Sequence, residues 1–359
     1  MIASRSTFNI YTTLAHHVDL YNHWSPFGRI ILNNDTVPPR HREMIMLRTG
    51  WLCQSEYEFA QHARIATGEA VGMTPAEIDA IAAGPDAPNW TAFESTLLRM
   101  VDELRYDAMI SDATWAALEE EYTDEQIVTA IFIAGQYQLV SMALNSLGVQ
   151  LDEGLEFRLP DGHPLPGPAG RPNAARLTTP RIAPLRAEDV DPAQPEIVSR
   201  LTGGEVLNLF ATMVRYPQLA GTMNGFLTYL LGEEARLSAA DRELVILRTA
   251  WNTNTPYEWA HHAPLALQVG LTEAQIAAIP QGVGADIWDE RQVASLTAAD
   301  ELRAQAFITD PTWARLEAHY DTQEMIEIIY AVGGYSLAGL AMNSLGIQVE
   351  AGYTEYLID

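Results

Sequence analysis

Two acids and a histidine recur at a fixed spacing in two stretches of this chain. The first stretch, residues 42–62, reads REMIMLRTGWLCQSEYEFAQH, and the second, residues 242–262, reads RELVILRTAWNTNTPYEWAHH. An imidazole titrates near neutral pH, and a carboxyl group between apolar helices has its pKa raised and can donate, so these groups can move protons without a cofactor. The candidate catalytic residues are Glu43, Glu58 and His62, with Glu243, Glu258 and His262 in the second stretch.

Helical spacing positions these groups relative to one another. Glu58 and His62 are four residues apart, which puts them one turn apart on the same helix face. Their helix is expected to open at residues 55–58 (SEYE), which have the pattern of a capping box. Glu43 lies on the preceding helix, which is expected to begin near Arg40 after a Pro-Pro pair. From there Glu43 can fix the tautomer of the imidazole or act from the opposite face.

Each of these groups also has a purely structural interpretation. Glu58 occupies the acid position of a capping box, Glu43 can pair with a nearby arginine such as Arg48, and His62 can be a hydrogen-bonded core histidine. The same alternatives hold for the second stretch. The chain has no H-E-x-x-H motif and no Cys/His cluster, so a metal site is not expected.

The two stretches belong to a long internal repeat, which indicates two related structural units. The offset is 200 residues at the stretches above and 198 from Thr74 and Thr272 onward, and the copies end in NSLGVQ and NSLGIQ. We expect one domain at residues 1–156 and a second at residues 180–359. The segment between them, residues 157–179, is rich in Pro, Gly and Arg and is expected to be an extended linker.

Helical periodicity dominates the chain, and almost no segment alternates with period two, so we expect an all-α fold. Capping boxes predict further helix starts at Thr74, Thr123 and Thr272. Asp112 and Asp310 are expected to be the N-caps of two matched helices.

Composition excludes several classes of function. The formal net charge of −26 argues against nucleic acid and anionic membrane partners, which need a basic surface. The 21 basic residues are all arginine, so Schiff-base chemistry and a P-loop lysine are excluded. The chain has no glycine-rich phosphate loop and no G-x-S-x-G elbow, and we expect neither hydride nor phosphoryl transfer.

A single cysteine, Cys53, limits redox chemistry. One thiol cannot form an internal disulfide or a C-x-x-C pair, and the matched residue in the other copy is Thr253, so a repeated function cannot need it. No uninterrupted apolar run reaches 18 residues, and the N-terminus lacks the pattern of a signal peptide. We expect a cytoplasmic protein that acts on a small molecule without a cofactor.

At these residues the chain resembles the carboxymuconolactone decarboxylase family, which also contains the AhpD-like alkylhydroperoxidases. The resemblance rests on PPRHREMIMLR, WLCQSEYEFAQH, ISDATWAAL and GQYQLVSMALNSLGVQ and on their partners in the second half, and it covers nearly the whole chain as two fused copies. It implies an all-helical fold in which the two copies form a pseudo-dimer. It also implies a homo-oligomer, a trimer or a dimer of the fused chain, with sites between helices and often near subunit contacts.

The peroxidase branch of this family relies on a C-x-x-C pair whose second cysteine lies four residues before the histidine. Those positions are Ser55 and Glu58 in the first copy and Thr255 and Glu258 in the second, so both thiols are missing from both copies. Thiol-based peroxide reduction is therefore not expected, while the proton-transfer residues of the family pattern remain.

The resemblance favours a cofactor-free lyase that decarboxylates a small carboxylated lactone or a related intermediate. His62 or Glu58 would protonate the carbon that loses CO₂, and an arginine would hold a substrate carboxylate. An isomerase or dehydratase with the same residues, and a non-catalytic ligand-binding or scaffold protein, remain alternatives. The first copy has Gln61 and Gln136, which could orient a substrate, where the second has His261 and Gly334, and the sequence leaves open which copy is active. The candidate substrate-binding residues are Arg48, Ser55, Tyr57, Gln61 and Asn145 in the first copy and Arg248, Thr255, Tyr257, His261 and Asn343 in the second.

Overall fold

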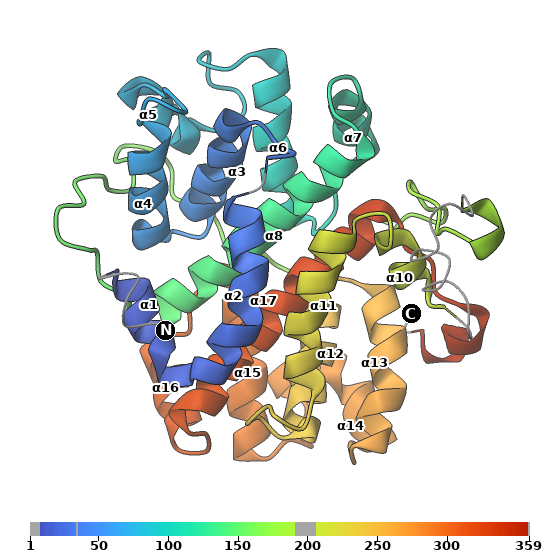
Figure 1. Ribbon diagram of the computed structural model, residues 1–359. Helices are drawn as coiled ribbons and strands as arrows, with labels where there is room; N and C mark the ends of the chain where they lie inside the picture. The colour runs from blue at the N-terminus through green and yellow to red at the C-terminus, as the bar shows by residue number, and fades with distance from the viewer. Residues whose placement is uncertain (1–7, 34, 191–205, 358–359) are drawn as a thin grey trace.

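The computed structural model describes residues 8–33, 35–190 and 206–357 of the chain. All regular secondary structure in these ranges is helical, and no strand occurs in them, so the expected all-α fold is confirmed (Figure 1). Residues 191–205, between the expected linker and the first helix of the second copy, lie outside the described residues.

The two copies contain matched helices in the same order. The helices of the first copy are α1 (Asn9–Leu14), η2 (Ala15–His17), α2 (Val18–Leu32), α3 (Pro39–Leu52), α4 (Glu56–Ala66), α5 (Pro75–Ala83), α6 (Ala92–Tyr106), α7 (Asp112–Glu119) and α8 (Asp124–Ser146). Those that follow are η3 (Ala187–Asp189), α10 (Asn208–Met213), α11 (Pro217–Leu231), α12 (Ala239–Asn252), α13 (Pro256–Gln268), α14 (Glu273–Ala278), η4 (Ile279–Gly284), α15 (Glu290–Gln305), α16 (Asp310–Glu317), α17 (Thr322–Leu345) and η5 (Ala351–Tyr356).

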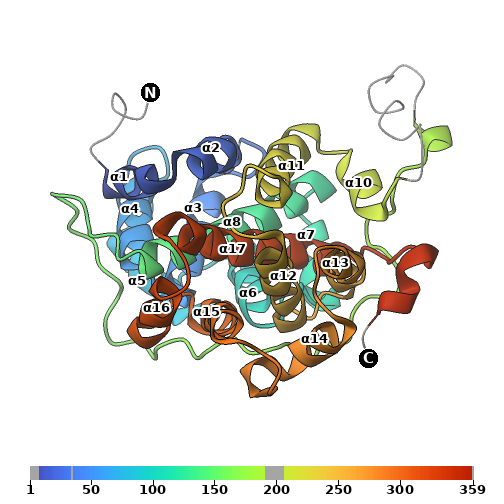
Figure 2. The same cartoon turned by 90° about the horizontal axis from the view of Figure 1, so that it is seen from below.

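The centre of the molecule is the crossing of α8 and α17, the last long helix of each copy (Figures 1 and 2). Glycine makes the approach possible at two matched points. A Cβ atom at Gly135 would lie 2.8 Å from the side chain of Leu337, and a Cβ atom at Gly333 would lie 2.6 Å from the side chain of Leu139. The two leucine–glycine contacts are reciprocal, as a pseudo-twofold relation between the copies requires.

Both central helices are long and apolar enough to cross a membrane by length and composition alone. Their apolar windows are completely buried inside the protein, as core helices of a folded domain also are. All-round apolar helices of this kind need neighbours on every face, which the other helices of both copies supply.

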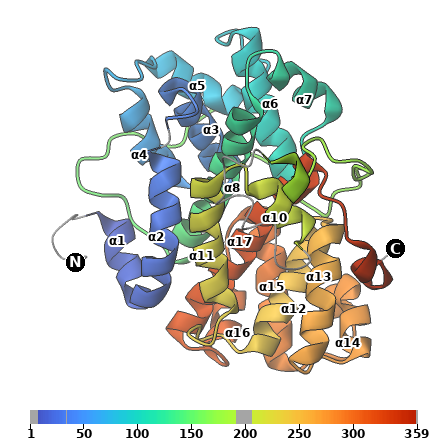
Figure 3. The same cartoon turned by 45° about the vertical axis from the view of Figure 1, so that its right-hand side comes forward.

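Other contacts between the copies are polar or involve whole helices. Helix α2 packs beside α11 (Figure 3). Arg105 donates a hydrogen bond of 2.7 Å to the carbonyl of Arg303, and Arg303 returns an identical bond to the carbonyl of Arg105. The imidazole of His17 lies 2.8 Å from the carboxylate of Glu327. The expected pseudo-dimer of two helical copies is confirmed.

Local sequence signals predict most helix starts correctly. The expected capping boxes are present at Thr74, Thr123 and Thr272. The predicted N-caps Asp112 and Asp310 are wrong by one residue, since the caps are Ser111 and Thr309. Each aspartate is instead the first helical residue, where its negative charge faces the positive end of the helix dipole.

The expected linker, residues 157–179, contains neither helix nor strand; its first part contacts the first copy, where His163 lies 3.2 Å from Asp79, and its later part contacts the second copy. The guanidinium of Arg171 stacks on the ring of Trp251 at 3.9 Å. Arg176 donates to the carbonyls of Thr253 and Asn254 at 2.8 and 2.7 Å. These contacts hold the segment in place by its side chains, although its backbone has no regular structure of its own.

Candidate active site

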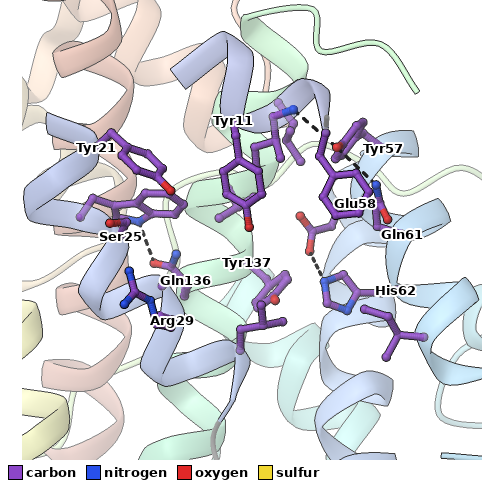
Figure 4. A pocket seen from close by; sticks show the side chains of 18 of the residues that line it. Tyr11, Tyr21, Ser25, Arg29, Tyr57, Glu58, Gln61, His62, Gln136 and Tyr137 are labelled. Carbon is purple, nitrogen blue, oxygen red and sulfur yellow. Dashed lines mark hydrogen bonds and ion pairs between the residues drawn. The ribbon is translucent and has the colours of Figure 1, made fainter. Parts of the chain in front are cut away.

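Each copy contains a cavity beside its Glu/Glu/His group. The first cavity has a volume of about 240 Å³ and is lined by residues of α1, α2, α4 and α8 (Figure 4). Glu58 and His62 form part of its buried wall, and the exposed Arg29 lies on the opposite side. The candidate residues of the first copy therefore face a space that a small molecule can enter.

The imidazole of His62 is held by Glu43 from the preceding helix. Glu43 Oε2 lies 2.7 Å from His62 Nδ1, and both side chains are buried. A proton on Nδ1 donates to the carboxylate and leaves Nε2 directed toward Glu58. Burial lowers the pKa of His62, but the hydrogen bond and charge of Glu43 outweigh it, so the pKa is raised overall.

Glu58 is an acid that stays protonated near neutral pH. Its side chain is 3% exposed, and its Oε1 lies 3.6 Å from His62 Nε2 and has no hydrogen-bond partner among the described residues. Burial raises the pKa of Glu58 to about 8, with His62 opposing the shift and the negative charge of Glu43 adding to it. A neutral carboxyl group beside a cavity is a ready proton donor.

The capping box expected at residues 55–58 does not form. Ser55 is the N-cap of α4, but its side chain makes no capping hydrogen bond. Gln54 has a φ of 49° in the tight turn before it, and this turn lets the Ser55 amide donate to the carbonyl of Gly50 at 2.9 Å. Because that amide is already satisfied, Glu58 is free to face the cavity, and capping does not explain its presence.

The second copy repeats the histidine–acid pair but differs at the other acid. Glu243 Oε2 lies 2.8 Å from His262 Nδ1. Neither carboxyl oxygen of Glu258 has a hydrogen-bond partner among the described residues, although the side chain is only 1% exposed. Burial raises the pKa of Glu258 well above its usual range, and the charge of Glu243 adds to the shift. The expected capping box at Thr255 is also absent.

A tyrosine from the central helix orients each imidazole. The ring of Tyr137 meets that of His62 edge to face, with centroids 4.8 Å apart, and Tyr335 meets His262 in the same way at 4.9 Å. Both tyrosines line the cavity of their copy. Their recurrence in the sequence is consistent with ordinary core packing, and only the fold shows that they contact the histidines.

Two expected substrate contacts lie at the edge of the first cavity. Tyr57 and Gln61 line it, and both donate hydrogen bonds to one carboxylate oxygen of Asp152, at 2.6 and 2.5 Å. Asp152 follows α8 and folds back over α4, so it fixes both side chains. The matched group of the second copy consists of Tyr257, His261 and Glu350.

Arg48 and Arg248 do not line either cavity, which corrects the expectation that they hold a substrate carboxylate. Arg48 forms a two-pronged ion pair with Asp102 at 2.7 and 2.9 Å and donates to the carbonyl of Ile81 at 2.7 Å. Arg248 does the same with Asp300. Their place on α3 and α12 turns them away from the histidines and toward neighbouring helices, where they have a structural role.

Four further expected substrate contacts lie outside both cavities: Ser55, Thr255, Asn145 and Asn343. Asn145 donates to the carbonyls of Cys53 and Ala306 at 2.9 and 3.1 Å, and Asn343 donates to the carbonyl of Ala108 at 3.1 Å. Each asparagine therefore joins its own copy to the other. The polar residue on the last helix therefore stabilises the pseudo-dimer.

Most polar side chains of the first cavity were not among the residues predicted from the sequence. Gln136, a sequence candidate for orienting the substrate, lines the cavity from α8, and the residues that were not predicted lie on α1 and α2: Tyr11, Tyr21, Ser25 and Arg29. Figure 4 shows them facing the Glu58–His62 wall from the other side of the cavity. The guanidinium of Arg29 has no ion pair or hydrogen bond with any described residue. Comparison of the two copies could have indicated these positions, since they are polar in the first copy and mostly not in the second.

Cys53 and the acidic side chains are the candidate groups for redox or metal chemistry. Cys53 is buried and lines neither cavity, and burial raises the pKa of its thiol. Within the ranges that the structure describes, no group of three or more His, Cys, Asp or Glu side chains is arranged to hold a metal ion.

Comparisons with known proteins agree with the repeat. The model of the carboxymuconolactone decarboxylase family matches residues 19–103 and 217–301. A search of curated proteins finds no match. Among solved structures, a variant of the debrominase Bmp8 in complex with 2,3,4-tribromopyrrole is 17% identical with a TM-score of 0.41 and covers 51% of this chain and 97% of its own. An uncharacterised peroxidase-related protein from Silicibacter sp. TM1040 is 16% identical with a TM-score of 0.42 and covers 50% of this chain and 97% of its own.

The two matched ranges of the family model lie 198 residues apart, which is also the offset of the repeat over most of its length. Each range begins within or next to the long helix before the Glu/His helices, α2 or α11, and ends in α6 or α15. The chain therefore belongs to the carboxymuconolactone decarboxylase family and carries two fused copies of the family's domain.

Proposed function

We propose that the first copy is a cofactor-independent carboxy-lyase that decarboxylates a small lactone or keto acid bearing a second carboxylate. The proposal rests above all on one observation, the Glu43–His62 pair with the protonated Glu58 beside it at the buried wall of a cavity. Membership of a family named for a decarboxylase supports an enzymatic role in general and does not specify the reaction.

The proton-transfer step follows from the charges of these three groups. When CO₂ leaves, the electron pair of the broken bond passes to carbon and spreads into the neighbouring carbonyl. Glu58 then gives its proton to that carbon and becomes a carboxylate next to His62, whose raised pKa favours the charged imidazolium. A proton from solvent restores Glu58, so each turnover consumes one proton and releases one CO₂.

Arg29 is the proposed anchor for the carboxylate that the product retains. Its guanidinium lines the cavity opposite Glu58 and has no partner among the described residues, unlike that of Arg48. The carboxylate that leaves must lose its charge, and it therefore belongs near the apolar, buried side of the cavity. An arginine beside the leaving carboxylate would stabilise the ground state and slow the reaction.

The test is CO₂ release from a panel of lactones and β-keto acids that carry one or two carboxylates. We expect the His62→Gln and Glu58→Gln variants to lose about 10²–10⁴-fold in kcat, because a positioned proton donor contributes that much. Arg29→Thr should raise KM for the dicarboxylates with a smaller change in kcat. The matched variant His262→Gln reports which copy turns over each substrate.

The same experiment separates the alternatives. Turnover of the panel without CO₂ would identify an isomerase or dehydratase that uses the same groups. Unchanged CO₂ release by the His62→Gln/His262→Gln double variant would contradict the proton-transfer scheme. Absence of any substrate-dependent signal across the panel would favour a ligand-binding or scaffold protein.

A further inference from the structure

The cavity of the second copy is larger and less polar than that of the first. Its volume is about 380 Å³, and α10, α11, α13 and α17 form most of its walls. Small-molecule pockets commonly measure ~300–1,000 Å³, so this cavity is of ligand size. Its apolar walls are formed mainly by Phe210, Met213, Met223, Leu227, Leu265 and Met342.

Matched positions of the repeat account for the change in character. The polar or charged residues of the first cavity and their counterparts are Tyr11 and Phe210, Tyr21 and Ala220, Arg29 and Thr228, Arg64 and Pro264, and Gln136 and Gly334. As a result, no arginine is present among the described residues that line the second cavity. A carboxylate that entered it would lose water without gaining the guanidinium that Arg29 supplies in the first copy, which disfavours the binding of anions.

Glu258 is the buried polar group of this cavity that lacks a partner. It lines the space, it is 1% exposed, and neither of its oxygens has a hydrogen-bond partner among the described residues. Burial raises its pKa well above the usual range and so favours the protonated form, which presents an O–H group with no acceptor among the described residues. Buried donors in folded proteins are nearly always satisfied, and here a ligand oxygen can satisfy this one.

The residue that packs against this acid differs between the two copies. Glu58 packs against Gly50, where a Cβ atom would lie only 3.2 Å from Glu58 Cγ. The matched residue is Ala250, whose methyl group occupies that space. No contact between Glu258 and His262 corresponds to the 3.6 Å approach of Glu58 to His62 within the described residues.

We propose that the second cavity binds an uncharged, largely apolar small molecule of about one ring, whose single carbonyl or hydroxyl oxygen accepts a hydrogen bond from Glu258. The size and walls of the cavity select an apolar body, and the absence of an arginine among the described lining residues selects against acids. This inference goes beyond the proposed decarboxylation, since it concerns the other copy and requires no turnover.

Calorimetric titration with three probes of one shape tests the proposal at neutral pH. The probes are tert-butylcyclohexanone, tert-butylcyclohexane and tert-butylcyclohexanecarboxylate. We expect the ketone to bind at one site per chain more tightly than the hydrocarbon, and the carboxylate to bind most weakly. Glu258→Leu should weaken ketone binding about threefold to tenfold, the contribution of one hydrogen bond, and leave the hydrocarbon unchanged. Glu258→Gln keeps a donor and should retain the preference for the ketone.

A second variant tests the cavity without altering a buried residue. Thr228 is exposed at the edge of the cavity, and Thr228→Arg restores the cation that Arg29 supplies in the first copy. It should convert the second cavity to carboxylate binding, whereas Thr228→Ser should change nothing. The proposal is overturned if no probe binds, if wild type prefers the carboxylate, or if Glu258→Leu does not alter the ratio of ketone to hydrocarbon affinity. The expected order of probe affinities does not depend on catalysis by the first copy, so it holds even if no CO₂ release is found.

Discussion

Gly50 lies directly against the side chain of Glu58, and a Cβ atom at residue 50 would be 3.2 Å from Glu58 Cγ and 3.4 Å from the amide of Phe59. The glycine therefore lets α4 approach α3 closely enough for the acid to face the histidine. We expect Gly50→Ala to move Glu58 away from His62 and to lower kcat for CO₂ release by about tenfold or more, because a misplaced donor transfers its proton less effectively.

The reciprocal change Ala250→Gly is the matched control for this prediction. It opens the corresponding space in the second copy and should not lower the activity assigned to the first. Alanine is favoured over glycine in a helix by ~1 kcal/mol, so a loss of activity in Gly50→Ala without a large loss of stability would support the positional explanation. Denaturant unfolding of both variants checks this, and undiminished kcat in Gly50→Ala would refute it.

The contact between Glu43 and His62 should control the pKa of the histidine. The carboxylate of Glu43 raises the pKa of His62 against the lowering effect of burial. Glu43→Gln removes the charge, so the pKa of His62 should fall, and kcat should fall with it. NMR titration of the imidazole signals measures the shift. Glu243→Gln in the second copy leaves the His62 signal in place and identifies it, and an unchanged His62 pKa in Glu43→Gln would contradict the pairing.

The raised pKa of Glu58 predicts the alkaline limb of the pH–rate profile. Glu58 donates only when it is protonated, so kcat should be nearly constant below a pH of about 8 and should fall above it. Glu58 and His62 lie 3.6 Å apart, and the measured value belongs to the pair. Glu58→Gln should abolish this limb in whatever activity remains, and a limb that survives in Glu58→Gln would assign it to another group.

Arg48 and Arg29 should respond to substitution in opposite ways. Arg48→Met removes a buried partner of Asp102 and of two carbonyl groups, and should lower the free energy of unfolding by about 3 kcal/mol. Arg29 is exposed and unpaired within the described residues, so Arg29→Thr should change stability little while raising KM for dicarboxylates. Urea unfolding and steady-state kinetics of both variants distinguish the roles, and a similar stability loss in both would contradict them.

The homo-oligomer implied by the family resemblance remains a prediction. Sedimentation equilibrium should give a mass that is a multiple of 39.6 kDa, two or three times that of the chain. A mass of 39.6 kDa would contradict this prediction.

Much of the site could be predicted from local sequence because local geometry determines it. The four-residue spacing of Glu58 and His62 places them on one face of any helix. The internal repeat supports this prediction, because the same spacing recurs in the second copy. The capping boxes at Thr74, Thr123 and Thr272 formed for the same reason, since each involves only groups within three residues. The capping box at Ser55 failed where a turn to Gly50 satisfied the amide first.

The substrate side of the cavity could not be predicted in this way. Arg29 and Gln136 belong to helices that are distant in sequence from His62, and they meet it only because α2 and α8 pack around the same space (Figure 4). Arg48, which is close in sequence to the Glu/His residues, turns away because Asp102 and backbone carbonyls pair with it.

The sequence by itself therefore determined the repeat, the all-α fold, the helices and the one-turn spacing of Glu58 and His62. The tertiary structure decided which face of each helix meets a cavity, that Glu43 reaches His62, and that one cavity is more polar than the other. The physical reason is that helix spacing and capping act over a few residues, whereas burial of apolar surface is non-directional and brings together residues from many helices. Which polar group is then paired and which is left facing a ligand depends on that packing.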